Sequence, residues 1–140
     1  MALEERTRHL LETAAADPDT PEGLERYVAE LVHQVRRLVQ HRGLLEVELD
    51  GCRHRIELLR QDILTWTEQA ALSVSESRDD LARLALKKKA ECTTRRDRLD
   101  DRLVQLQLDM ESLDADLEQL RATVRRTLDR LAGSTTPGQA

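Results

Sequence analysis

The sequence has almost no aromatic residues: one Trp, one Tyr and no Phe among 140. Aromatic side chains supply much of the volume of an ordinary globular core. Their near absence, with 35% charged residues, argues against a compact globule. Only three Pro and five Gly interrupt the chain, which favours long helices. Because an apolar fraction of 39% is too high for a disordered chain, we expect helices that meet along narrow apolar stripes.

The charge and the apolar runs narrow the function classes. A formal net charge of −5 does not indicate attraction to nucleic acid, so no nucleic-acid partner is expected. No run reaches the roughly 18 apolar residues of a transmembrane helix. The first residues, MALEERTRHLLETAAADPD, lack the apolar centre of a signal peptide. The expected location is therefore the cytoplasm.

Cysteine is scarce as well. Cys52 and Cys92 stand alone, without CxxC or Cys/His spacing. Isolated thiols of this kind usually serve as small buried apolar side chains, and we expect that role here.

The N-terminal part is divided by prolines. Residues 1–16 form a candidate short helix, and residues 17–23 form a linker that contains Pro18 and Pro21. Thr20 suits the cap of the next helix, with Pro21 at its first position.

From Leu24 onward, alternating steps of four and three select mostly apolar residues, the spacing of a coiled coil. This pattern predicts a first long helix over 24–74. Its stripe consists of Leu24, Val28, Leu31, Val35, Leu38, Arg42, Leu45, Leu49, Cys52, Ile56, Leu59, Ile63, Trp66, Ala70 and Ser73. Arg42 and Ser73 are the two interruptions, and Arg42 is of a kind that can fix the register.

A second stripe predicts a helix over 81–132, followed by a tail at 133–140 that we expect to be disordered. It runs through Leu81, Ala85, Lys88, Cys92, Arg95, Leu99, Leu103, Leu106, Met110, Leu113, Leu117, Leu120, Val124, Thr127 and Leu131. The steps between Cys92 and Leu103 are three, four and four. We interpret this as a stutter, a local unwinding of the supercoil.

The stretch 75–80 between the helices contains neither Gly nor Pro, so one continuous helix is an alternative. Its serines compete for backbone hydrogen bonds, and Asp79 and Asp80 suit a helix N-terminus. We therefore expect the tip of a hairpin here. The fold class is all-α, a long antiparallel coiled-coil helical hairpin with a short N-terminal helix.

Charge patterning supports this hairpin. If the chain folds about residue 77, the acids of 106–120 face Arg36, Arg37 and Arg42 on the first helix. Exposed ion pairs of this kind affect which register the two helices adopt more than they add to the stability of the hairpin. The same register puts Cys52 and Cys92 roughly 15 Å apart along the helices, too far for a disulfide.

The sequence from Trp66 to Leu72 (WTEQAAL), with Arg78 to Lys89 (RDDLARLALKKK), resembles the hairpin tip of the phage shock protein A family. That family includes the inner-membrane-associated proteins and belongs to the ESCRT-III superfamily. Its members carry a Trp near the end of the first long helix and an acidic DLAR-AL-x-K motif at the start of the second. The acid-Pro break at Asp17-Pro18 also matches, and the resemblance covers roughly residues 17–132.

The resemblance implies a non-enzymatic protein of the bacterial envelope stress response and of membrane maintenance. Such proteins self-assemble, contact the membrane, or bind a transcriptional activator of the AAA+ class. The partner or assembly contacts would lie at the tip, at Trp66, Asp79, Asp80, Leu81, Arg83 and Leu84. The segment before Asp17 is short and weakly amphipathic, which argues against direct insertion into lipid.

Lys87, Lys88 and Lys89 form the densest basic run, a candidate contact for an anionic surface. The competing interpretation is a solvated helix face, balanced by neighbouring aspartates. No set of residues has the spacing of a catalytic or metal site, and no cofactor is expected. A structural coiled-coil adaptor without a membrane role is the alternative function.

Overall fold

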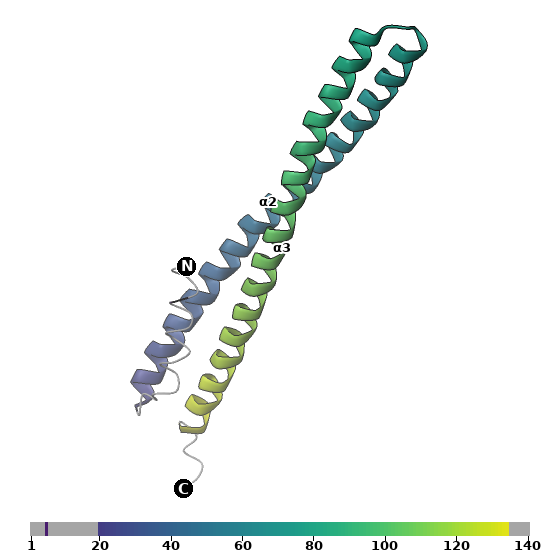
Figure 1. The fold of residues 1–140 in the computed structure, drawn as a ribbon. Helices are drawn as coiled ribbons and strands as arrows, with labels where there is room; N and C mark the ends of the chain where they lie inside the picture. The colour runs from purple at the N-terminus through teal and green to yellow at the C-terminus, as the bar shows by residue number, and fades with distance from the viewer. Residues whose placement is uncertain (1–4, 6–19, 135–140) are drawn as a thin grey trace. The chain divides into compact units, whose positions relative to one another are not determined.

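The computed structural model describes Glu5 and residues 20–134. This part contains no strand and two helices, α2 at Pro21–Ser75 and α3 at Asp79–Ser134 (Figure 1). The all-helical prediction is confirmed for the described residues, and the two helices pack against each other as a helical hairpin requires. Apart from Glu5, the expected N-terminal helix at 1–16 lies outside the described residues. Most of the expected tail, residues 135–140, also lies outside them.

Helix α2 begins at the predicted cap, three residues before the predicted range of 24–74. The backbone N–H of Gly23 donates to Oγ1 of Thr20 at 3.1 Å, and Pro21 takes the first helical position. This hydrogen bond satisfies one of the N–H groups that a helix start leaves without a partner. The predicted cap is therefore confirmed.

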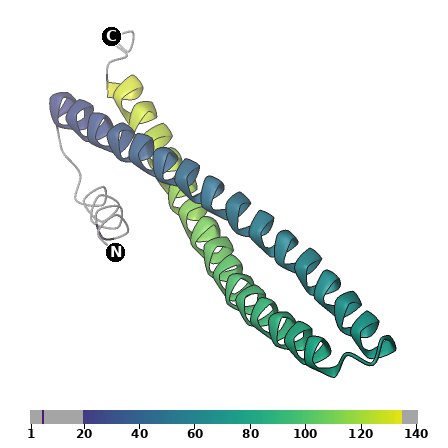
Figure 2. The ribbon, with the colours of Figure 1, turned by 90° about the horizontal axis from the view of Figure 1, so that it is seen from above.

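The chain reverses within three residues, Glu76 to Arg78 (Figure 2). The N–H of Arg78 donates to the carbonyl of Ser73 at 2.8 Å, and that of Ser77 donates to the carbonyl of Val74 at 3.0 Å. Ser77 has a φ of 56°, in the left-handed region. These features define a Schellman motif, which usually has Gly at this position. The sequence predicts the turn but gives no sign of this motif, because Ser takes the place of Gly.

The chain divides into two compact units. The first consists of the start of α2, up to Leu44, with the end of α3 from Met110 onward. Its described core is made mainly of leucines, with a few polar side chains. Its buried residues are Leu24, Tyr27, Leu31, Gln34, Leu38, Leu113, Leu117, Leu120, Thr123 and Thr127.

The second unit, Leu45–Asp109, holds the rest of both helices and the turn. Its core changes along the helices, from large side chains to small ones near the turn. Its buried residues are Leu45, Leu49, Cys52, Ile56, Ala70, Ser73, Ala82, Ala85, Cys92 and Leu106.

Burial follows the predicted stripe in α2: every stripe residue from Leu24 to Ser73 is buried or half-buried. The same holds in α3 from Leu99 to Leu131. The spacing of three and four residues therefore predicted the packed face correctly over these stretches. Tyr27 and Gln34 are buried beside the stripe, and the spacing gave no indication of them.

The predicted stripe is wrong in the first turns of α3. Leu81, Lys88 and Arg95 are exposed. The buried or half-buried residues are instead Ala82, Ala85, Lys89, Cys92 and Arg96. With these positions the steps of three and four continue without interruption to Leu131, so the predicted stutter is absent. The error arose because the prediction followed Leu81, the more apolar side chain, whereas the buried residue is the small Ala82.

Candidate functional site

The turn end of the second unit combines a small-residue core with large exposed apolar side chains. Ala70, Ser73, Ala82 and Ala85 are between 3% and 8% exposed. Around them stand the residues that we name the tip surface. These are Leu72, Val74, Leu81, Leu84 and Leu86, each between 45% and 63% exposed. Since small residues already fill the packed face, these larger side chains have no place inside the unit.

The sequence-predicted tip residues occupy different environments. Leu81 and Leu84 lie three residues apart on α3 and share a side of the helix. Asp79 and Asp80 are exposed in the first turn of α3, where negative charge is favourable, and Arg83 is exposed nearby. Trp66 differs, because it is half-buried on the packed face of α2. The structure therefore leaves the leucines and charged residues accessible and gives Trp66 a packing role.

The three lysines do not form one surface. Lys87 and Lys88 are exposed, whereas Lys89 is half-buried on the packed face of α3. Nζ of Lys88 lies 3.6 Å from a carboxylate oxygen of Glu91. Consecutive residues of a helix point in directions about 100° apart, so the run offers less concentrated charge than its sequence suggests.

In both units an ion pair between described residues joins the two helices. In the first unit, Nε of Arg42 donates to Asp114 at 2.6 Å, with the two side chains 39% and 48% exposed. In the second, Arg102 donates to Glu48 at 2.8 Å, and this hydrogen bond raises the pKa of the guanidinium. The predicted meeting of an acidic band with Arg42 is thus confirmed, with Asp114 as the partner.

Both cysteines are buried and free, as predicted. The thiol of Cys52 donates to the backbone carbonyl of Leu99 at 3.3 Å. This contact links α2 to α3 within the second unit.

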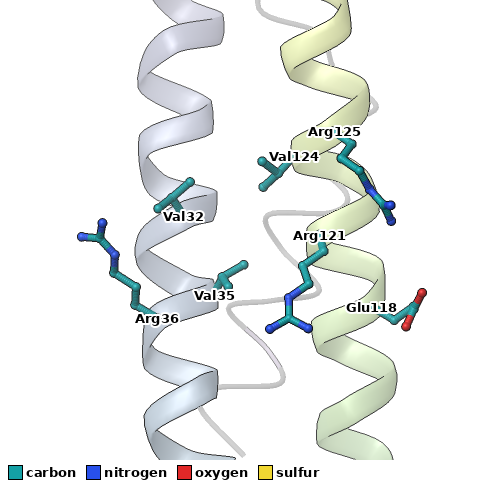
Figure 3. A pocket seen from close by; sticks show the side chains of 7 residues that line it. All are labelled: Val32, Val35, Arg36, Glu118, Arg121, Val124 and Arg125. Carbon is teal, nitrogen blue, oxygen red and sulfur yellow. The ribbon is translucent and has the colours of Figure 1, made fainter.

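An open groove of about 640 Å³ lies between the helices of the first unit (Figure 3). Val32 and Val35 point toward α3, and Val124 points toward α2. Arg121 lies between the helices, with Arg36 and Arg125 on opposite outer sides. Glu118 completes the lining of this feature, which we name the valine groove. The sequence did not lead us to predict this groove. Its sign in the sequence is valine in place of leucine at positions 35 and 124 of the stripes.

Buried polar residues of the first unit were also missed, among them Tyr27 and Gln34. Tyr27 is 7% exposed, and burial raises the pKa of its hydroxyl above the usual 10.0, although the Arg126 guanidinium acts in the lowering direction. The side chain of Gln34 is buried too, and no described residue donates a hydrogen bond to its Oε1. Both lie one residue before a stripe position, where a helix pair is usually partly solvated.

The described residues offer neither a metal site nor a membrane-spanning stretch. No group of three or more His, Cys, Asp or Glu side chains is arranged to hold a metal ion in this part of the chain. Neither α2 nor α3 contains a stretch long and apolar enough to cross a membrane.

Compared with known proteins, the chain matches no family model, and a search of curated proteins also finds no match.

Proposed function

We propose that the chain is a non-enzymatic, antiparallel coiled-coil hairpin that works by binding other protein surfaces. The pairing of the helices supports the coiled coil. Arg42 contacts Asp114, Glu48 contacts Arg102, and Cys52 contacts Leu99, so later residues of α2 meet earlier residues of α3. Knobs of one helix would then fill holes of the other along both stripes.

In this arrangement each step along the stripe of α2 is matched by an equal step back along α3. Leu38 would share a layer with Leu117, Ile56 with Leu99, and Cys52 with Leu103. The corrected phase of α3 is consistent with such layers near the turn, since it would put the small, buried Ala82 opposite the small, buried Ser73. Small residues in these layers allow the helices to approach closely.

The tip surface is the observation that carries the proposed function. Leu81 and Leu84, both exposed on one side of α3, form its clearest part. Contiguous exposed apolar side chains usually mark a surface for another protein. Leu81 and Leu84 are among the residues expected to make partner contacts. The resemblance to the phage shock protein A family gives the corresponding biology, which is self-assembly or binding of a AAA+ activator during envelope stress. We place the chain in the cytoplasm, with peripheral contact to the inner membrane as part of the same proposal.

A structural adaptor without a membrane role is the second candidate. It is favoured because two basic residues of α3 lie next to acidic side chains. Arg96 pairs with Asp97 at 3.0 Å and lies 3.9 Å from Asp100, while Lys88 is near Glu91. Acids interleaved in this way reduce the attraction of the helix to an anionic lipid surface.

The test compares two double substitutions in the full chain. Leu81→Ser with Leu84→Ser removes apolar side chains from the tip surface. Val104→Ser with Leu108→Ser is the matched control, since these side chains are 55% and 53% exposed away from the turn. Sedimentation velocity over a range of concentrations measures self-association. The proposal predicts that the tip substitutions weaken association by about tenfold and the control by less than about twofold.

A chain that stays monomeric at every concentration would contradict self-assembly, and equal effects of both variants would contradict the assignment to the tip. Cosedimentation with vesicles of anionic lipid at low salt separates the two candidates. Binding that disappears at high salt supports membrane contact, whereas no binding at low salt favours the adaptor.

A further inference from the structure

The valine groove has a basic rim around an apolar floor. Arg36, Arg121 and Arg125 stand beside Val32 and Val124. None of the three arginines forms an ion pair with another residue in the described part of the chain. Arg42, by contrast, has its charge matched by Asp114. The rim therefore presents positive charge that no neighbouring carboxylate neutralises directly.

Exposed apolar side chains extend the floor along the same face. Val39 lies seven residues after Val32 and is 45% exposed, while Leu128 lies seven residues after Arg121 and is 47% exposed. Residues seven apart fall on nearly the same side of a helix. From 118 to 128, α3 rises about 15 Å. This length suits about three turns of a docked helix.

The charge of the groove opposes that of the chain. The whole sequence has a net charge of −5, yet the lining holds three arginines and one glutamate. Complementary charge steers association and suppresses wrong partners. An acidic segment of a partner protein would therefore be attracted to this place.

We propose that the valine groove binds an acidic amphipathic helix of a partner protein. The inference rests on the proposed function, that the chain acts by protein association, and it names the partner's chemistry. Apolar side chains at every third or fourth position of the bound helix would cover Val32, Val35 and Val124. Its flanking carboxylates would meet Arg36 on one side and Arg125 on the other, with Arg121 between them (Figure 3).

The experiment uses the full chain and a synthetic, fluorescent amphipathic peptide with leucines on one face and glutamates on both flanks. A second peptide carries lysine at every glutamate position. Fluorescence anisotropy measures both dissociation constants. We expect saturable binding of the glutamate peptide, and binding of the lysine peptide at least about tenfold weaker.

Two double variants carry the same change of charge. Arg121→Glu with Arg125→Glu alters the rim and should weaken binding of the glutamate peptide by at least about tenfold. Arg55→Glu with Arg98→Glu is the control, since both arginines are exposed in the other unit and form no ion pair with a described residue. It should change binding by less than about twofold. Circular dichroism checks that both variants retain their helix content.

Several results would overturn the proposal. These are no saturable binding of the glutamate peptide, equal binding of both peptides, or an equal loss in both variants. Competition by a peptide of residues 1–19 at similar affinity would assign the groove to the chain's own N-terminal segment. Dependence of self-association on Arg121 and Arg125 would assign it to a second copy. Binding of anionic vesicles, but not of the peptide, through these arginines would assign it to lipid.

A failure of the groove proposal can be distinguished from a failure of the proposed function. The tip substitutions lie in the Leu45–Asp109 unit and the groove substitutions in the other. If the tip variant loses association while the glutamate peptide fails to bind, only the groove assignment falls.

Discussion

At the scale of single residues, buried leucines dominate the stability and ion pairs select the register. Leu31, Leu38, Leu106 and Leu120 are at most 1% exposed. Burying each such side chain stabilises the fold by about 1.5–3 kcal/mol. The Arg42–Asp114 pair, with both side chains more than a third exposed, contributes at most about 1 kcal/mol. One leucine thus outweighs one ion pair.

Leu106→Ala and Leu108→Ala test this difference two residues apart. Leu106 is 1% exposed, and its truncation leaves a cavity, so we expect a loss of about 2–5 kcal/mol in the free energy of unfolding. Leu108 is 53% exposed, and the same change should cost less than about 0.5 kcal/mol. Urea unfolding followed by circular dichroism measures both. Similar losses in the two variants would show that the buried face of α3 is misassigned.

Tyr27 should make the stability of the fold depend on pH in the alkaline range. Its pKa is raised in the folded chain, so above the unfolded value of 10.0 the folded state binds more protons than the unfolded state. The stabilisation is therefore fully present below pH 10.0 and is lost as the pH rises through the folded pKa.

Tyr27→Phe removes this titration, because Phe has no ionisable group. Urea unfolding of both proteins at a series of pH values measures the difference. From neutral pH to just below pH 10.0 the difference in unfolding free energy should be constant, and above it the original chain should lose stability faster. Parallel curves for the two proteins across the alkaline range would count against the burial of Tyr27.

At the scale of the helices, the sequence predicts most of the packed face and misplaces one end of it. Leucine spacing identified the stripe of α2 and that of α3 beyond Leu99, because large apolar residues there have a single favourable side. Near the turn, hydrophobicity pointed to Leu81, although Ala82 is the buried residue. Which residue fits depends on how closely the helices approach, and that distance comes from the partner helix.

The candidate sites were predictable to different degrees. The tip residues Leu81 and Leu84 were identified from a family-like motif, and the structure leaves both exposed. The valine groove escaped prediction because spacing indicates which residues face the partner helix, but not how well their side chains fill the space between the helices. Only the packed arrangement brings Val32 beside Val124.

The turn offers a test of how the two helices are joined. Ser77 occupies the left-handed region with a φ of 56°, which is unfavourable for a residue with a Cβ. Ser77→Gly removes this penalty and should raise the unfolding free energy by about 0.5–1 kcal/mol. Ser77→Val adds a β-branched side chain and should lower it by about 1 kcal/mol or more. Urea unfolding of the three proteins measures the order of their stabilities. Val more stable than Gly at this position would contradict the left-handed turn.

At the scale of the whole molecule, we propose that function depends on two contact surfaces. The proposed coiled coil supplies the frame, and two surfaces in different units remain for partners: the apolar tip surface and the basic valine groove. Their different chemistry implies different partners. Because both depend on α2 and α3 packing in the proposed antiparallel layers, that register is the central claim.

An intramolecular cross-link tests the register most directly. In the full chain with Cys92→Ala, Leu103→Cys places a second thiol in the layer proposed for Cys52, whose own thiol contacts the carbonyl of Leu99. Val104→Cys is the matched control, since Val104 is 55% exposed on another side of α3. A disulfide needs Cα atoms about 4.4–6.8 Å apart. Under mild oxidation, non-reducing electrophoresis should show a monomeric cross-linked product for Leu103→Cys at every concentration, and none for Val104→Cys. Cross-linked dimers alone, increasing with concentration, would contradict the hairpin and indicate helices that pair between chains.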